Sequence, residues 1–227
     1  MEHGKAVREG SRQIAGMGSE MKRRIIMTAA GVLLSGFAVG MFNVSAFGMD
    51  PFQVFAHGIW LHTPLSFGTF YMILNLLMLI GVFFVDRSKI GLGTFINIFL
   101  LGYMVDFSTW IWNRAVFTES VMIRGFLLFS GVLLLCMASS LYFVGDLGVS
   151  TYDSVALCIS QHMKWKFFLV RVVCDLIVAL IGFGLGAILG IGTLVSAFGM
   201  GPAISFFNIH MSEPLRYGKR NGAGTIS

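Results

Sequence analysis

Long apolar stretches separated by short polar segments run along almost the whole chain. Six of them are long enough to cross roughly 30 Å of hydrocarbon as helices with a rise of about 1.5 Å per residue. None shows the apolar–polar alternation typical of a barrel strand. Because a backbone in lipid must satisfy its own hydrogen bonds, the pattern predicts an all-α membrane protein with six transmembrane helices, at about residues 25–47, 66–86, 90–110, 123–145, 167–188 and 190–209.

Two further segments, residues 51–61 and 151–163, are too short to cross, because each covers only about 16–20 Å as a helix. Both begin with helix-start signals. Asp50 precedes a proline and can cap the first segment, while Ser150 with Asp153 three residues later has the spacing of a capping box. The pattern predicts two half-helices, either re-entrant or lying at the interface.

The two halves of the chain repeat each other. Residues 31–59 align with 131–159 with nine identities in 29 ungapped positions, and Gly-x-Gly-Thr at 91–94 recurs at 190–193. Glycine pairs in register are hard to obtain by chance from apolar composition. Each half therefore reads span, half-helix, span, span. Three crossings is an odd number, so the second half must enter the membrane from the opposite side, which predicts inverted repeats.

This repeat divides the chain into five segments. They are a basic amino-terminal segment, a first membrane repeat, an external linker, a second membrane repeat and a tail, at residues 1–24, 25–110, 111–122, 123–209 and 210–227.

Charge placement supports the same topology. Only 12% of residues are charged, against about 25% in soluble domains, and the mean hydropathy is +0.81. With both termini in the cytoplasm, the outside holds only Arg114 and Arg124, as the positive-inside rule requires. The loop 48–65 lacks basic residues and its counterpart 148–166 has two. The other 14 basic residues fall inside: Lys5, Arg8, Arg12, Lys22, Arg23, Arg24, Arg87, Lys89, Lys164, Lys166, Arg171, Arg216, Lys219 and Arg220.

Several functional classes find no support in the sequence. The basic residues do not cluster on a soluble face, so nucleic acid is not an expected partner. Three scattered cysteines and the isolated His57 and His62 do not have metal-ligand spacing, so we expect no metal or cofactor. No recognisable catalytic set occurs, so an enzyme is not expected. The expected partners are the lipid bilayer and a small solute or ion, and the sequence leaves a homo-oligomer open.

Charged residues inside spans are candidates for function because each costs a few kcal/mol in lipid. Asp175 lies near the middle of the fifth span, and Asn75 is its approximate mate in the first half. Inverted repeats would bring both to a pseudo-two-fold axis near the bilayer centre. Alternatively, Asp175 pairs with Arg171 one helical turn earlier and is structural. A carboxylate that exchanges this partner for a proton or cation would serve both roles.

Other polar positions are weaker candidates for the path. Asp106 lies near the outer end of the third span, as an interfacial carboxylate or as part of the path, and Asn97 lies deeper, opposite Ser196 in the repeat. Asp50 and Asp153 head the half-helices, where they either cap the helix or mark an end that favours anions. The Gly-x-Gly-Thr pair either allows close helix packing or acts as a hinge.

The runs Gly48-Met49-Asp50-Pro51-Phe52-Gln53-Val54, Ser66-Phe67-Gly68-Thr69 and Gly91-Leu92-Gly93-Thr94 with Asn97 resemble bacterial integral membrane proteins of the YczE/YitT type. The resemblance covers nearly all of residues 25–208. The second half departs from it at Ser150-Thr151-Tyr152-Asp153, where the family often has a Gly-Pro turn. The resemblance implies a multi-pass protein of the bacterial plasma membrane with a transport role.

Two functions therefore follow as hypotheses. The first is a small-solute or ion transporter or channel in which Asp175 couples an ion or proton, Asn75 and Asn97 line the path, and one half rocks against the other. The alternative is a non-transporting membrane partner, such as an assembly factor or regulator of another membrane or biosynthetic system.

Overall fold

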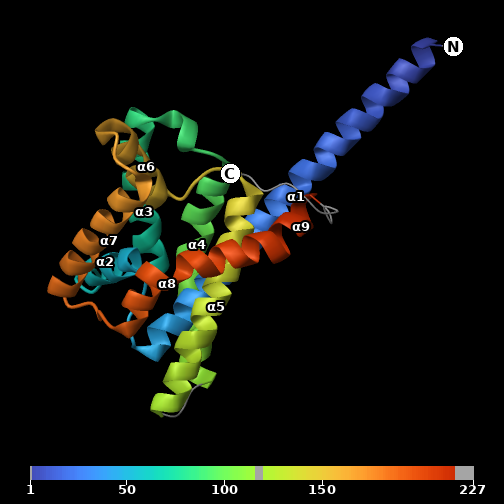
Figure 1. Cartoon of the computed structure of the whole chain (residues 1–227). Coiled ribbons are helices and arrows are strands. Elements are labelled where there is room, and N and C mark those ends of the chain that lie inside the picture. Colours follow the sequence, from blue (N-terminus) through green and yellow to red (C-terminus); the bar gives the residue numbers. More distant parts are fainter. Residues whose placement is uncertain (1, 116–119, 218–227) are drawn as a thin grey trace.

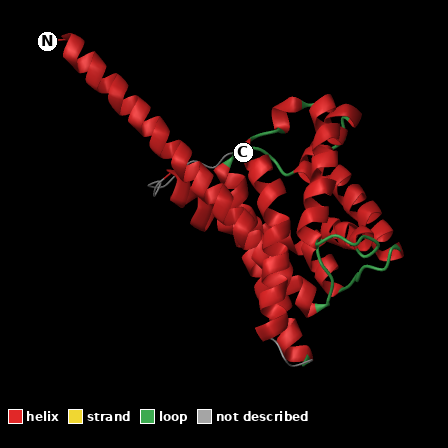
Figure 2. Ribbon diagram, turned by 180° about the vertical axis from the view of Figure 1, so that it is seen from behind, coloured by secondary structure: helices red, strands yellow, loops and turns green. Residues whose placement is uncertain are grey.

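The computed structural model describes residues 2–115 and 120–217, and these residues form helices joined by short loops, without strands (Figure 2). Met1, part of the predicted linker 111–122 and part of the predicted tail 210–227 lie outside the described residues. The helices are α1 (Glu2–Ser45), α2 (Pro51–Trp60), α3 (Phe67–Val85), the 3₁₀ turn η1 (Arg87–Lys89), α4 (Leu92–Ala115), α5 (Val121–Gly145), α6 (Thr151–Met163), α7 (Phe167–Gly184), α8 (Ile191–Phe207), the π-helical turn η2 (Asn208–Ser212) and α9 (Glu213–Tyr217).

Four helical segments are long and apolar enough to cross a membrane: Gly18–Ser45 within α1, and the whole of α3, α4 and α5. The segments Ile191–Ala197 and Gly199–Tyr217, bent by 54° at their junction, make a fifth if they are one span. α7 is an 18-residue apolar helix that carries Arg171 and Asp175. Helices thus form at all six predicted positions, and four or five of them meet the criteria for a crossing within the described residues. The chain is a multi-pass membrane protein.

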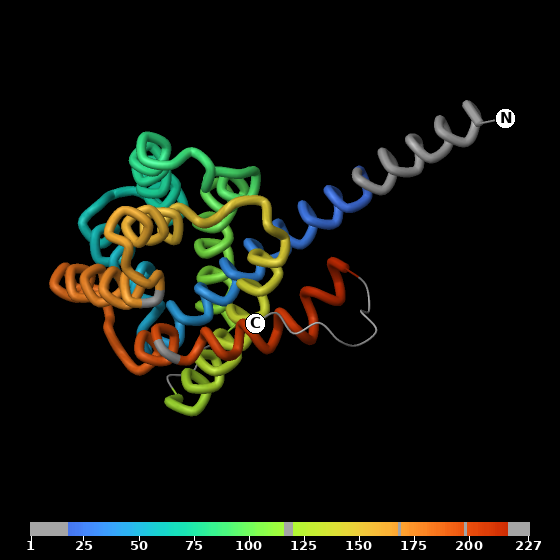
Figure 3. The backbone as a smooth tube through the Cα atoms, turned by 45° about the horizontal axis from the view of Figure 1, so that its top comes forward, coloured from blue at the N-terminus to red at the C-terminus, as the bar shows by residue number. Residues whose placement is uncertain are grey.

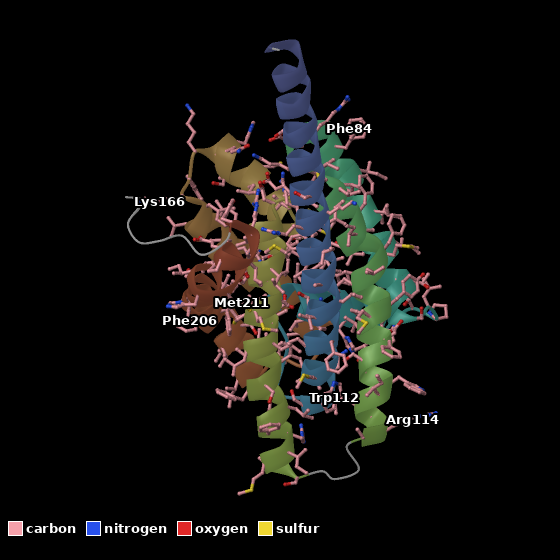
Figure 4. The ribbon with its side chains drawn as sticks, turned by 90° about the vertical axis from the view of Figure 1, so that its right-hand side faces the viewer. Phe84, Trp112, Arg114, Lys166, Phe206 and Met211 are labelled. Carbon is pink, nitrogen blue, oxygen red and sulfur yellow. The ribbon has the colours of Figure 1, made fainter. Side chains whose placement is uncertain are left out.

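The outer surface agrees with this assignment. Large apolar side chains point outward from the bundle, including those of Phe84 and Phe206, residues that are 79% and 56% exposed (Figure 4). Such a surface is unfavourable in water and suits contact with lipid. Lys166 and Arg114 lie at opposite ends of the bundle (Figure 4).

The loops after α1 and α5 have positive φ angles at equivalent positions of the two halves. α1 and α5 are each followed by a residue with left-handed backbone, Ala46 with φ of 53° and Asp146 with φ of 52°. Gly48 and Gly148 follow with φ of 98° and 117°. These values favour glycine because a Cβ clashes with the backbone in this region. The repeat in the sequence is therefore also a repeat in local structure.

The predicted caps of the half-helices are confirmed. Asp50 Oδ1 accepts hydrogen bonds from the backbone N–H groups of Phe52 at 3.1 Å and Gln53 at 3.3 Å. Ser150 Oγ accepts from the N–H of Asp153 at 3.1 Å. Each cap satisfies amide groups that a helix start leaves without partners.

Each half supplies hydrogen bonds to the other at the loops that precede the half-helices. The N–H of Gly192 donates to the carbonyl of Phe47 at 2.8 Å, and the N–H of Gly93 donates to the carbonyl of Leu147 at 2.6 Å. These two bonds are equivalent under the repeat. The Gly-x-Gly-Thr segments therefore mediate close packing between halves, as one of the two interpretations of the sequence expected.

α1 and α5 pack antiparallel along their length. Gly31 faces the carbonyl of Ala138, where an added Cβ would lie 2.7 Å from the oxygen. At the ends of the pair, Arg24 Nε donates to the carbonyl of Gly145 at 2.9 Å, and Arg124 Nε donates to the carbonyl of Ser45 at 2.7 Å. Arg24 and Arg124 are equivalent residues 100 positions apart, and each satisfies a helix end of the other half.

The helices form two groups, and each group contains helices from both halves of the sequence (Figure 1, Figure 3). α1 packs against α4 and α5, and α5 packs against α8. The other group contains α2, α3, α6 and α7, in which α2 lies against α7 and α6 against α3. Each half-helix is thus packed against a longer helix of the opposite half, and α3 links the two groups through its contact with α4.

We expect Gly148→Ala to destabilise the protein, because a Cβ there would lie 2.8 Å from the Cα of Gly91 and the φ of 117° disfavours a side chain. The backbone conformation alone costs at least about 1–2 kcal/mol. The measurement is the midpoint of thermal unfolding in detergent. Gly81→Ala is the control, because a Cβ on Gly81 in α3 meets nothing within 4 Å. Equal midpoints for both variants would contradict the docked loop.

Candidate functional site

A cavity of about 540 Å³ lies between the helices and is lined by residues from α1 through α8. Six of the seven residues expected to form the path line this cavity: Asp50, Asn75, Asn97, Asp153, Arg171 and Asp175. They come from segments far apart in the sequence, and the crossed packing of the two halves brings them together.

Arg171 is the centre of an ionic cluster on one wall of the cavity. Its Nε lies 3.2 Å from Asp175 Oδ1, and its Nη1 pairs with Asp153 at the start of α6. The pair of Arg171 and Asp175 that the structural interpretation expected is present. The side chains of Asp175 and Asp153 are only 14% and 19% exposed, so solvent screens these charges less than it screens surface pairs.

Tyr152 joins the same cluster. Its hydroxyl donates to Asp175 Oδ1 at 2.7 Å, and the guanidinium carbon of Arg171 lies 4.5 Å from its ring centre, as in a cation–π contact. Tyr152 also stacks on Phe52, with ring centres 4.6 Å apart and planes inclined by 14°. Phe52 and Tyr152 are equivalent positions of the two repeats.

The cavity is also lined by Tyr152, Phe52 and Gln53, which the sequence did not identify as site residues. Phe52 and Tyr152 could have been found from the sequence, because both half-helices carry an aromatic residue at the same position of the repeat. Gln53 is 4% exposed, and its Oε1 has no hydrogen-bond partner in the part of the chain that the structure describes.

Asn75 joins α3 to the start of α6 through a hydrogen bond. Its Nδ2 donates to the carbonyl of Tyr71 at 2.8 Å, and its Oδ1 accepts from the hydroxyl of Thr151. The residue is 1% exposed. Asn75 and Asp175 line the same cavity, as the repeat suggested, but no hydrogen bond joins them among the described residues. Asn75 has a structural role beside any role in a path.

Asn97 and its repeat mate Ser196 lie on α4 and α8 and both line the cavity. Ser196 Oγ donates to the carbonyl of Gly192 at 2.8 Å within its own helix. Asn97 makes no hydrogen bond or ion pair with other described residues, so its amide is free to face a ligand.

The starts of both half-helices already hold carboxylates of the chain. Asp50 caps α2, and Ser150 Oγ donates to Asp153 Oδ2 at 2.7 Å at the start of α6. An anion that approached either end would meet a carboxylate before it met free N–H groups. The arrangement therefore disfavours anion binding at these two helix ends.

Asp106 lies outside the cavity lining. Its Oδ2 accepts a hydrogen bond from the N–H of Gly68 at 2.8 Å, which satisfies the start of α3. This gives Asp106 a structural role in joining α4 to α3. His62 Nε2 lies 3.1 Å from the carbonyl of Leu185. No cluster of three or more metal-ligating side chains occurs among the side chains that the structure describes within residues 18–115 and 120–217.

Comparison with known proteins places the chain in a family. A relative from Haemophilus influenzae, described as an uncharacterized protein, is 28% identical over 183 residues, which cover 81% of each chain. The uncharacterized membrane protein YczE of Bacillus subtilis is 26% identical over 192 residues, which cover 84% of this chain and 87% of YczE. No solved structure matches the chain. The match to YczE confirms the resemblance found in the sequence. The family of unknown function DUF6198 matches residues 22–209, and the chain belongs to that family.

Proposed function

We propose that the chain is a small-solute or ion transporter or channel of the bacterial plasma membrane, with both termini in the cytoplasm. The observation that supports this most directly is the cavity of about 540 Å³, which brings Arg171, Asp153 and Asp175 together inside a bundle with an apolar outer surface. Ionisable groups are costly at membrane depth, and they are typical of substrate and ion pathways.

The proposed topology is six crossings in two inverted repeats, with α7 and α8 as the fifth and sixth. Three observations support it. α1 and α5 are antiparallel, the capping bonds of Arg24 and Arg124 are interchanged by the repeat, and the bonds of Gly93 and Gly192 to the opposite half are equivalent. Inverted repeats place the substrate site between them near the bilayer centre, which fits a cavity lined from both halves.

In this mechanism Asp175 is the group that couples to an ion or proton. At present it accepts hydrogen bonds from Tyr152 and Arg171. Arg171 also pairs with Asp153, so it can stay partnered when Asp175 takes up a cation or proton. The exchange changes the interaction between α7 and α6, and this change is the step that can bias the conformation.

The packing of each half-helix against the opposite half of the chain indicates which helices would move together during transport. The two sequence halves interlock through the contacts of α2 with α7 and α6 with α3, so rocking one half against the other would break both. Movement of the group α2, α3, α6 and α7 against the group α1, α4, α5 and α8 keeps these two contacts and changes the contact of α3 with α4 instead. Loops containing Gly48, Gly148 and Gly186, all with positive φ, connect the two groups.

We expect purified protein in liposomes to move at least one solute of a broad metabolite panel, and Asp175→Asn to slow that flux at least about tenfold. The reason is that the substitution removes the charge of Asp175 from the path. A hydrogen bond to a charged group contributes about 1.5–3 kcal/mol, and this stabilisation would be lost. Asp86→Asn is the matched control, because Asp86 also forms an ion pair, with Lys89, but does not line the cavity.

Unchanged flux in Asp175→Asn would remove the role assigned to that residue. If wild-type liposomes moved no solute faster than empty ones, the alternative of a non-transporting membrane partner would replace the proposal.

We expect Arg171→Gln to lower stability by about 1–3 kcal/mol, because it leaves Asp153 and Asp175 without their cation. The thermal midpoint in detergent measures this. Adding Asp153→Asn to the variant should restore part of the loss, since it removes one unpaired charge. Arg87→Gln is the control, because Arg87 is exposed and lies outside the cavity. A variant Arg171→Gln as stable as wild type would show that the cluster contributes nothing to the fold.

A further inference from the structure

The cavity carries more negative than positive charge. Its described lining contains three carboxylates, Asp50, Asp153 and Asp175, and a single cationic side chain, Arg171. With all four ionised, the lining has an excess of two negative charges. Arg171 pairs with Asp153 and Asp175, whereas Asp50 uses only Oδ1 for its capping bonds. Asp50 is also within electrostatic range of Asp175 and Arg171.

Next to Asp50, the cavity presents an acceptor without a donor. Gln53 lies three residues further along α2, on the same helix face, and is 4% exposed. Its side chain makes a hydrogen bond with Tyr71, but its Oε1 has no partner among the described residues. An amide oxygen can only accept a hydrogen bond, and leaving it buried without one costs about 1–3 kcal/mol. The hydroxyl of Tyr142, a residue 6% exposed and also in the lining, has no partner among the described residues either, and it can donate as well as accept.

The size and the walls of the cavity indicate an organic ligand. About 540 Å³ lies within the range of roughly 300–1,000 Å³ typical of small-molecule sites, whereas a water molecule takes about 30 Å³. Apolar side chains from α1, α4, α5 and α8 form much of the lining: Val32, Val39, Leu101, Leu135, Met200 and Ile204. An inorganic ion would leave these walls without a contact.

The site already accommodates one cationic group. The guanidinium of Arg171 lies over the ring of Tyr152 and between two carboxylates. Aromatic faces and carboxylates together are the chemistry that recognises ammonium and guanidinium compounds. We propose that the cavity binds a small organic cation, whose N–H donors reach Asp50 and Gln53 and whose apolar part contacts the walls formed by α1, α4, α5 and α8.

This inference rests on the proposed function, because it assumes that the cavity is a solute site. Binding to the cavity can nevertheless be measured separately from transport. The probes are n-butylammonium and n-butylguanidinium, with n-butanol and butyrate as neutral and anionic compounds of the same chain length. We expect the two cations to raise the thermal midpoint of the detergent-solubilised wild type in a saturable way. Butanol and butyrate should leave it unchanged, because neither satisfies both the excess negative charge and the acceptor of Gln53.

Gln53→Leu provides the sharper test. The substitution removes a buried acceptor that lacks a partner and also the side-chain hydrogen bond between Gln53 and Tyr71, two effects on stability of opposite sign, so we expect stability close to that of wild type. The apparent affinity for n-butylammonium should nevertheless fall at least about tenfold, the equivalent of about 1.4 kcal/mol. Asp86→Asn, outside the cavity, should respond to the cations as wild type does.

Each outcome bears on a separate claim. No response to either cation, a stronger response to butyrate, or full affinity in Gln53→Leu would overturn the inference of a cation site. Cation binding without flux in liposomes would keep this inference and refute transport. Flux of anions alone would keep transport and refute the cation site.

Discussion

The ends of a helix leave backbone groups without hydrogen-bond partners, and in this protein each half of the chain supplies such partners to the other. Arg24 satisfies the end of α5, and Arg124, its equivalent 100 residues later, satisfies the end of α1. The amides at the starts of α8 and α4 bind carbonyls of the loops after α1 and α5. These hydrogen bonds hold the two halves together as an interlocked pair.

That constraint also creates the cavity. The half-helices α2 and α6 are too short to cross, and each packs against a longer helix of the opposite half, so their first turns meet inside the bundle. Phe52 and Tyr152, equivalent residues of these turns, stack on each other. The ionic cluster of Arg171 assembles beside them, from α6 and α7. A site of this kind is shared by both repeats, which is why its carboxylates, amides and aromatic rings come from almost every helix.

Much of this was predictable from the sequence because it depends on local chemistry. The caps of Asp50 and Ser150, the apolar lengths of the spans and the repeat register are all readable along the chain. The pair of Arg171 and Asp175 was also expected, because its members are one helical turn apart. In contrast, the lack of a partner for Gln53 and the bond of Asp106 to the start of α3 depend on contacts between distant segments. Local sequence patterns contain no information about such contacts. For the same reason the sequence did not predict that Asn75 joins α3 to the start of α6 through its hydrogen bond with Thr151.

The central claim is that the equivalent loops after α2 and α6 lie on opposite sides of the membrane. Single cysteines at Leu65 and Trp165, 41% and 52% exposed and 100 residues apart, test it in a chain whose three native cysteines are replaced by alanine. The readout is reaction with a membrane-impermeant maleimide in intact cells and in inverted vesicles. The account predicts labelling at position 65 only in intact cells and at position 165 only in inverted vesicles. Labelling of both positions from the same side would contradict the inverted repeat and, with it, the shared cavity mechanism.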